Sequence, residues 1–205
     1  MIQAGSAGAG RPRGSSREML QEAAAELFLE QTYARTSIDQ ITRRAGVSRN
    51  TFFNYFTAKS DLLWVEVDAS LAELPTALAA IDATVPVVDA VKQALLEVAA
   101  TFGPSRVPWA LTQSDLMGTT NDLEASALSR LAAQARLVTD IVAQRTGRAG
   151  GDLICSSFAM AVFAAAGAGA LSWAAAGVTR GNLAQYVDDA VSPVCAGFRL
   201  ELGFG

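Results

Sequence analysis

The chain has 205 residues, of which 51% are apolar and 18% charged, and its formal net charge is −4. A chain of this length and composition can build one large or two small domains around a buried core, which excludes a disordered protein. It contains no histidine. The commonest general base and the commonest transition-metal ligand are therefore both missing, which argues against an enzyme and against a metal site.

The charge is unevenly distributed along the chain. Residues 1–60 carry eight Lys or Arg and five acidic residues, a net +3, whereas residues 61–205 carry eight basic and fifteen acidic residues, a net −7. A basic N-terminal part attached to an acidic body is typical of proteins whose N-terminal part faces nucleic acid.

The cysteines and the N-terminal residues bear on the cellular compartment. Cys155 and Cys195 form no C-x-x-C pair, so we expect no zinc site, and two buried free thiols are favoured over a disulfide. Residues 1–14 are rich in Gly, Ala and Ser, carry Arg11 and Arg13, and lack the apolar stretch of a signal peptide. We interpret them as a disordered basic arm, either solvated or contacting DNA, on a cytoplasmic protein.

Residues 15–60 are predicted to form a first domain of three short helices. Apolar residues recur at helical spacing from about Ser16 to Gln31. A second helix is expected from about Ser37 to Ala45. Thr36 or Ser37 can cap it, and Thr36 and Asp39 match a loose capping box.

The second and third helices have the pattern of a helix-turn-helix. Gly46 lies where a left-handed turn conformation suits glycine, and Ser48 can cap a helix that runs to about Tyr55. Phe52 and Phe56 are four residues apart and should face the core. The polar residues between them then face outward, where such a helix enters the major groove of DNA. An ordinary polar helix surface is the alternative.

The outward residues have the chemistry of DNA recognition. Arginine can pair with guanine and asparagine with adenine, while hydroxyl groups and lysine serve phosphates. The residues that we predict to contact DNA are Arg17, Thr36, Arg44, Ser48, Arg49, Asn50, Thr51, Asn54, Tyr55 and Lys59.

This region resembles the N-terminal signature of the TetR family of repressors. The resemblance covers residues 16–64 and rests on Thr36-Ser37-Ile38, Ile41-Thr42, Ala45-Gly46-Val47-Ser48, Thr51-Phe52-Phe53-Asn54-Tyr55-Phe56, Lys59 and Leu62-Leu63. It implies a homodimer with a helical ligand-binding domain, a palindromic operator, and release of the DNA when a ligand binds. The TFFxYF variant, followed by Lys59, Asp61 and Trp64, is more narrowly similar to regulators found beside mycofactocin biosynthesis genes.

Two positions depart from the family pattern. Phe53 stands where the family usually has a tyrosine whose hydroxyl contacts a phosphate, so that contact is in doubt, although Tyr55 can compensate. Ala58 replaces a frequent serine before Lys59, and Thr57 can still cap the following helix.

Residues 61–205 are predicted to be helical, which gives an all-α fold of about nine helices with a ligand-binding and dimerisation domain. We expect helices at about 58–74, 86–102, 108–117, 122–146, 153–178 and 182–200. Leu74-Pro75 should stop or kink the first of them, because proline lacks a backbone donor.

The segment 153–178 carries no charge and is long enough to cross a membrane. Its bulk comes from Ala, Gly and Ser, which favours a buried, dimer-forming helix instead. The resemblance implies that the last two helices, 153–178 and 182–200, form the four-helix bundle of a homodimer.

Large apolar and aromatic residues are candidates for the wall of a ligand pocket, although such residues more often form plain core. They are Phe102, Trp109, Leu116, Met117, Phe158, Phe163 and Trp173. As a set they predict a small apolar or aromatic effector, with acyl-type compounds among the candidates, because ligand pockets are mostly apolar. We expect no cofactor and no metal.

The sequence thus favours a ligand-responsive, DNA-binding transcriptional regulator, a repressor released from a palindromic operator by an apolar small molecule. One alternative is an all-helical enzyme, for which no nucleophile–base or metal-ligand spacing is present. The other is a helical dimerisation protein whose DNA-reading head is weakened, as Phe53 in place of tyrosine would allow.

Overall fold

A computed structural model describes residues 15–105, 107–112 and 120–202, and the part of the chain that it describes is helical throughout, with no strand. The chain divides into two compact units, Met1–Leu62 and Leu63–Gly205. The arm 1–14 and the candidate ligand residues Leu116 and Met117 lie outside the described residues. The predicted all-α fold is confirmed.

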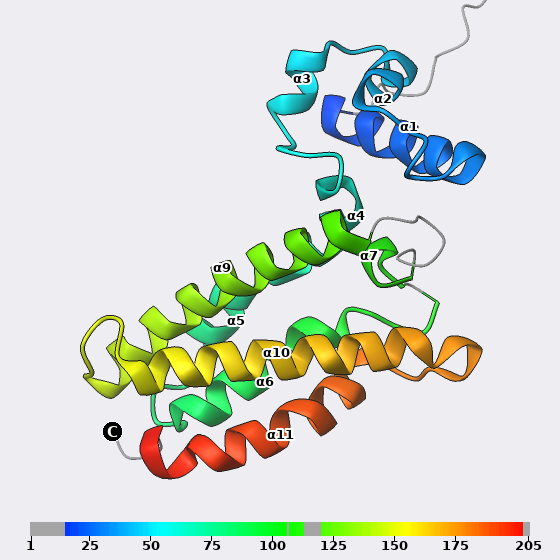
Figure 1. Cartoon of the computed structure of the whole chain (residues 1–205). Coiled ribbons are helices and arrows are strands. Elements are labelled where there is room, and N and C mark those ends of the chain that lie inside the picture. The colour runs from blue at the N-terminus through cyan, green and yellow to red at the C-terminus, as the bar shows by residue number, and fades with distance from the viewer. Residues whose placement is uncertain (1–14, 106, 113–119, 203–205) are drawn as a thin grey trace, which may run out of the picture. The chain divides into compact units, whose positions relative to one another are not determined.

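The first unit is a three-helix domain made of α1 (Ser16–Gln31), α2 (Ile38–Ala45) and α3 (Arg49–Phe53) (Figure 1). Its core consists of side chains that are no more than 6% exposed: Leu20, Leu27, Phe28, Tyr33, Ile41, Phe52 and Phe56. These residues come from all three helices and from the segments that follow α1 and α3, so burial of this one cluster fixes the orientation of α3.

Local hydrogen bonds set the limits of α2 and α3. Gly46 ends α2 with φ +69°, as the turn predicts, and the Ser48 side chain accepts a hydrogen bond from the Thr51 backbone to start α3. The capping box predicted for Thr36 and Asp39 is wrong. The box is formed one residue later by Ser37 and Gln40, because the Thr36 hydroxyl is buried.

The second unit is built from a succession of longer helices. They are α4 (Asp61–Leu71), α5 (Leu74–Ala80), α6 (Val87–Ala100), α7 (Trp109–Thr112), α9 (Thr120–Thr146), α10 (Leu153–Ala175), the short 3-10 helix η1 (Gly177–Thr179) and α11 (Leu183–Leu202). The first two residues of α4 belong to the first unit, so this helix is covalently continuous across the boundary.

The segment predicted as one helix over 58–74 differs from the expectation in two ways. The helix begins at Asp61, whose carboxylate accepts hydrogen bonds from the backbone of Thr57 and Ala58, so that Asp61 rather than Thr57 organises the start. The chain then opens a separate helix α5 with Pro75 in its first turn, where proline's missing N–H costs no hydrogen bond.

The core of the second unit lies between α6, α9, α10 and α11 (Figure 1). Cys155 and Cys195 both belong to this core and are free thiols. Burial raises the pKa of each thiol above its ordinary value, which keeps both groups protonated and unreactive.

Helices α10 and α11 approach each other closely at Gly169. A Cβ atom at this position would lie 2.6 Å from the backbone oxygen of Tyr186 and 3.2 Å from the Cα of Val187. Because both are backbone atoms, no side-chain rotation can relieve the clash. The prediction that small residues of 153–178 allow close helix contact is therefore met at this residue.

We expect Gly169→Ala to lower the free energy of unfolding by about 2 kcal/mol, since overpacking of a well-packed contact costs about 1–3 kcal/mol. Gly197→Ala on α11 is the control, because nothing lies within 4 Å of a Cβ atom placed there and alanine is the better helix former. Urea denaturation of both variants measures the difference. Equal stability of the two variants would contradict the close contact.

Helix α10 is the uncharged segment for which the sequence raised the question of a membrane span. Within the described residues it is the helix long and apolar enough to span a bilayer, with a mean hydropathy of 1.8 and 33% of the window buried. One side of α10 packs into the core. The other side is an exposed, uncharged stripe, which we call the α10 stripe: Leu153, Ser157, Met160, Ala164 and Ala168.

Candidate DNA-binding surface and ligand cavity

Helix α3 presents most of its polar residues to solvent. Arg49, Asn50 and Asn54 are exposed, as is Tyr55, which directly follows, whereas Phe52 is fully buried. The structure therefore brings the predicted base-reading residues together on one surface. Guanidinium and carboxamide groups placed in this way can form bidentate hydrogen bonds to guanine and adenine edges.

The Arg49 guanidinium is held by two neighbours. Its Nη1 lies 2.7 Å from Asp39 Oδ1 on α2, and its Cζ lies 5.7 Å from the centroid of the Phe53 ring. Both charged side chains of the ion pair are more than half exposed, and such a pair contributes only about 0–1 kcal/mol. Arg49 is thus oriented in the free protein and can exchange Asp39 for a base at small cost.

Phe53, the departure from the family pattern, is 46% exposed and contacts the Phe52 ring edge-on, with centroids 5.4 Å apart. It cannot donate a hydrogen bond to a phosphate. Its ring instead supports Arg49, and a cation over an aromatic face is attracted by the ring quadrupole. The substitution therefore removes the hydroxyl that could donate to a phosphate and keeps the aromatic ring that supports the neighbouring arginine.

Three other predicted contact residues border this surface. Ser48 is exposed and Thr51 half-buried, and their hydroxyl oxygens lie 2.8 Å apart. Arg17 is exposed on α1, with its Cζ 5.9 Å from the centroid of the Phe56 ring. All three side chains carry hydrogen-bond donors that could bind a phosphate oxygen.

Arg44 has a structural role that the sequence did not indicate. Its guanidinium lies 3.0 Å from a Glu26 oxygen and 2.8 Å from a Glu30 oxygen, so it joins α2 to α1. The hydrogen bonds from Arg44 lower the pKa of the Glu30 carboxyl and raise the pKa of Arg44 itself. A DNA contact by Arg44 would have to compete with two carboxylates.

Thr36 and Lys59 were predicted to contact phosphates, and the structure directs both side chains to protein atoms. Thr36 is 2% exposed, and its hydroxyl donates to the Thr32 carbonyl at 2.8 Å. The Lys59 ammonium donates to the carbonyls of Tyr33 and Thr36 at 2.8 and 2.7 Å, and lies 3.9 Å from the Tyr33 ring centroid. Lys59 therefore fixes the connection between α1 and α2.

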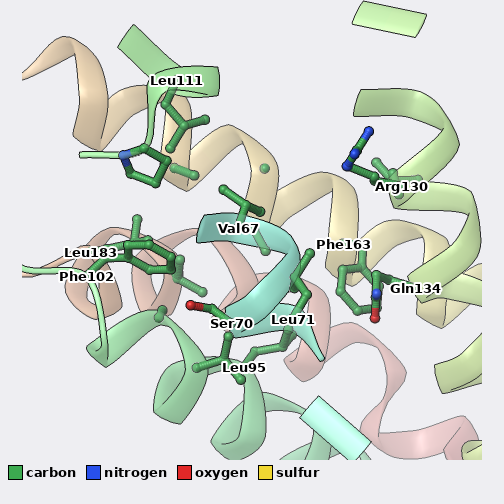
Figure 2. A pocket seen from close by; sticks show the side chains of 18 of the residues that line it. Val67, Ser70, Leu71, Leu95, Phe102, Leu111, Arg130, Gln134, Phe163 and Leu183 are labelled. Carbon is green, nitrogen blue, oxygen red and sulfur yellow. The ribbon is translucent and has the colours of Figure 1, made fainter. Parts of the chain in front are cut away.

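The second unit contains a cavity of about 260 Å³. Its wall is almost entirely apolar, with Val67, Leu71, Leu95, Phe102, Leu111, Phe163 and Leu183 among the lining side chains (Figure 2). They come from α4, α6, α7, α10 and α11 and from the segment after α6. An apolar wall of this kind suits a small apolar ligand.

One polar cluster lies at the α9 side of the cavity, where Arg130 lines the wall. Arg130 forms two hydrogen bonds with the Asp68 carboxylate, at 2.7 and 2.8 Å, and stacks over the Trp64 ring at 5.1 Å. The Trp64 indole nitrogen in turn donates to the Ser126 hydroxyl at 2.8 Å. These contacts join α4 to α9, so a ligand that displaces either helix must strain them.

The structure separates the predicted ligand residues into two groups. Phe102 and Phe163 line the cavity. Phe158 packs in the core against Phe198 with centroids 5.4 Å apart, and the Trp173 indole donates to the Gly181 carbonyl at 2.8 Å, so neither reaches the wall. Trp109 belongs to α7 and is not part of the wall either.

Sequence reasoning missed the contribution of α4 and α9 to the wall. Trp64, Val67 and Leu71 recur at helical spacing on α4, a signal that was available in the sequence. Arg130 and Gln134 are four residues apart on α9 and therefore share one face of that helix. Their position in the wall depends on tertiary packing, which the spacing alone does not reveal.

Comparison with known proteins gives a family match in each of the two units. Residues 20–64 match the family model of bacterial regulatory proteins of the tetR family, and residues 85–199 match the model of the MftR C-terminal domain. A Mycobacterium tuberculosis protein that carries the name mycofactocin biosynthesis transcriptional regulator MftR is 30% identical over 138 residues, which cover 67% of this chain and 69% of that protein.

Two solved structures share the fold. The TetR-family repressor FadR of Thermus thermophilus, solved in complex with lauroyl-CoA, gives a TM-score of 0.58 at 22% identity, covering 88% of this chain and 94% of that one. The fatty acid degradation regulator FadR of Bacillus halodurans gives 0.58 at 16% identity, covering 88% and 98%.

A helix-turn-helix unit followed by a helical unit with an apolar cavity defines a DNA-binding regulator. The matched family models extend over most of the chain and agree with that class. The chain belongs to the TetR family of transcriptional regulators.

Proposed function

We propose that this chain is a ligand-responsive repressor that acts in the cytoplasm, binds a palindromic operator as a homodimer, and leaves it when an apolar small molecule fills the cavity. The observation that carries the proposal is the apolar cavity of about 260 Å³, four of whose lining residues lie on α4. Because α4 is covalently continuous with the first unit, a ligand that favours one position of α4 favours one state of the regulator.

The chemistry of the cavity supports an apolar or aromatic effector, with acyl-type compounds as one class. The fold relative from Thermus thermophilus was solved with lauroyl-CoA, which carries an apolar acyl chain. The lining of this chain's cavity is suited to such a chain, since its side chains are mainly Leu, Val, Ala and Phe.

The α10 stripe supports dimerisation through α10 and α11. Its five exposed residues are uncharged, whereas a solvent-facing helix surface is usually charged. Small residues such as Ala164 and Ala168 would let a second copy of the helix approach closely. In a symmetric dimer the two α3 helices would enter successive major grooves, about 34–36 Å apart.

The test of DNA binding is fluorescence anisotropy with a labelled duplex from the region upstream of the gene. We expect specific binding whose affinity falls steeply with salt, because arginine contacts to phosphates release counterions. Binding without added effector would also exclude a helical dimerisation protein with a weakened reading head. Equal affinity for this duplex and for an unrelated one would overturn the proposal.

Arg49→Ala should relax sequence preference more than it weakens binding. A bidentate arginine–guanine contact contributes about 1–3 kcal/mol of discrimination, so the variant should lose roughly ten- to hundredfold preference at one guanine of each half-site. Anisotropy titrations with operators altered at single base pairs measure this. A variant that keeps the full preference at every position would show that Arg49 reads no base.

A further inference from the structure

Asp39 is the single acidic residue in residues 31–60, the part of the first unit that contains α2 and α3. Its side chain is exposed on α2, and its Oδ1 accepts a hydrogen bond from Arg49 on α3. Ser37 and Gln40 form the capping box of α2, so the Asp39 carboxylate is not needed to start that helix. A carboxylate beside a surface that meets DNA is repelled by phosphates. Asp39 therefore opposes DNA binding unless its contact with Arg49 contributes to recognition.

The contact with Asp39 leaves one edge of the Arg49 guanidinium available. Asp39 binds Nη1, and neither Nη2 nor Nε forms a hydrogen bond with the described residues. The N–H groups of Nε and Nη2 lie side by side, in the fork that matches O6 and N7 of a guanine. The Phe53 ring, 5.7 Å from Cζ, supports the guanidinium as well. Arg49 can thus bind a guanine while it keeps Asp39, and no exchange of partners is required.

We propose that Asp39 is a specificity-determining residue that acts through Arg49. The carboxylate stays bound on the DNA and orients the guanidinium toward a guanine, which reduces the side-chain ordering that binding requires. It also offsets the charge of Arg49, so that a phosphate gains less from this arginine than the two acceptors of a guanine do. Removal of the carboxylate frees Arg49 to bind phosphates of any sequence. The inference rests on the proposed function, because it concerns operator recognition by the same surface.

Asp39→Ala tests the proposal in anisotropy titrations of the full chain. The probes are the upstream duplex, the same duplex altered at single base pairs, and an unrelated duplex of equal length. We expect the preference for the guanine that Arg49 reads to fall about two- to tenfold, the range set by the ordering of one long side chain. Affinity for the unrelated duplex should rise, and the log–log salt slope should steepen by about one, because one more cation contacts a phosphate. Glu22→Ala removes the same charge from an exposed position of α1 and should change neither the preference nor the slope.

A double variant, Asp39→Ala with Arg49→Ala, separates action through Arg49 from any other role. Its base preference should equal that of Arg49→Ala alone, because Asp39 then has no guanidinium to orient. The melting temperature of Asp39→Ala should match that of Glu22→Ala, whereas a residue needed for folding would lower it. An unchanged preference in Asp39→Ala, a further loss in the double variant, or a lower melting temperature would overturn the assignment. Specific operator binding by the parent protein in the same titrations leaves the proposed function intact in each of these cases. Equal affinity of the parent protein for the upstream and unrelated duplexes would overturn both.

Discussion

Ala164→Glu should convert the dimer into a monomer and weaken operator binding by at least about a hundredfold. Ala164 lies in the middle of the α10 stripe and is exposed in the single chain, so a glutamate there would be solvated before association. In the proposed dimer two glutamates would be buried close together, and burying unpaired charges is strongly unfavourable. A monomer has only one DNA-binding unit. It therefore loses the gain in affinity of about 10²–10⁴ that two linked binding sites provide.

Light scattering after gel filtration measures the mass, and anisotropy measures operator affinity. The matched control is Ala133→Glu, which places the same side chain on an exposed position of α9 outside the α10 stripe. We expect the control to remain dimeric with unchanged affinity. If Ala164→Glu also remains dimeric, α10 is not the dimer surface.

Lys59→Met should destabilise the first unit by about 2 kcal/mol and reduce binding to every DNA sequence in parallel. The ammonium group donates to two backbone carbonyls and lies over the Tyr33 ring, and hydrogen bonds to a charged group contribute about 1.5–3 kcal/mol. Methionine retains the aliphatic stem but leaves both carbonyls without this donor. The connection between α1 and α2 would loosen. The packing that holds α3 in its orientation would loosen with it.

Thermal unfolding of the variant, followed by circular dichroism, measures the effect. Arg35→Met removes one positive charge from the same unit at an exposed residue whose side chain forms no hydrogen bond or ion pair with the described residues. Arg35→Met should change the free energy of unfolding by no more than about 0.5 kcal/mol. Were Lys59→Met as stable as Arg35→Met, with weaker DNA binding, Lys59 would be a phosphate contact after all.

The elements that could be predicted from the sequence are those that depend on local geometry. Gly46 at the turn, Ser48 at the start of α3 and the inward pair Phe52 and Phe56 each follow from spacing and backbone preference within a few residues. The same reasoning placed α9, α10 and α11 within a few residues of their limits. Such features follow from residues that lie close together in the sequence.

The side chains whose position was not foreseen are bound by residues far away in the sequence. Lys59 bonds to carbonyls 23 and 26 residues earlier, and Arg130 pairs with a carboxylate 62 residues away. A basic residue next to a recognition helix has the same sequence pattern whether it contacts a phosphate or the protein itself. Leu128 on α9 is apolar yet 64% exposed, because the packing of neighbouring helices selects the buried face.

Phe53 shows that a departure from a family pattern can be interpreted only in context. The sequence indicates the loss of a phosphate contact at this position. The structure adds that the ring supports Arg49, which an ion pair with Asp39 also orients. The change therefore modifies the proposed reading surface without removing the side chains that we propose contact bases.

The coupling between cavity and operator is tested most directly by measuring the operator dissociation constant with and without a ligand that raises the melting temperature. The account predicts that saturating ligand raises this constant at least about tenfold, and that operator DNA weakens ligand binding by the same factor, because coupling is reciprocal. An operator dissociation constant that stays the same while the cavity is saturated would contradict the account.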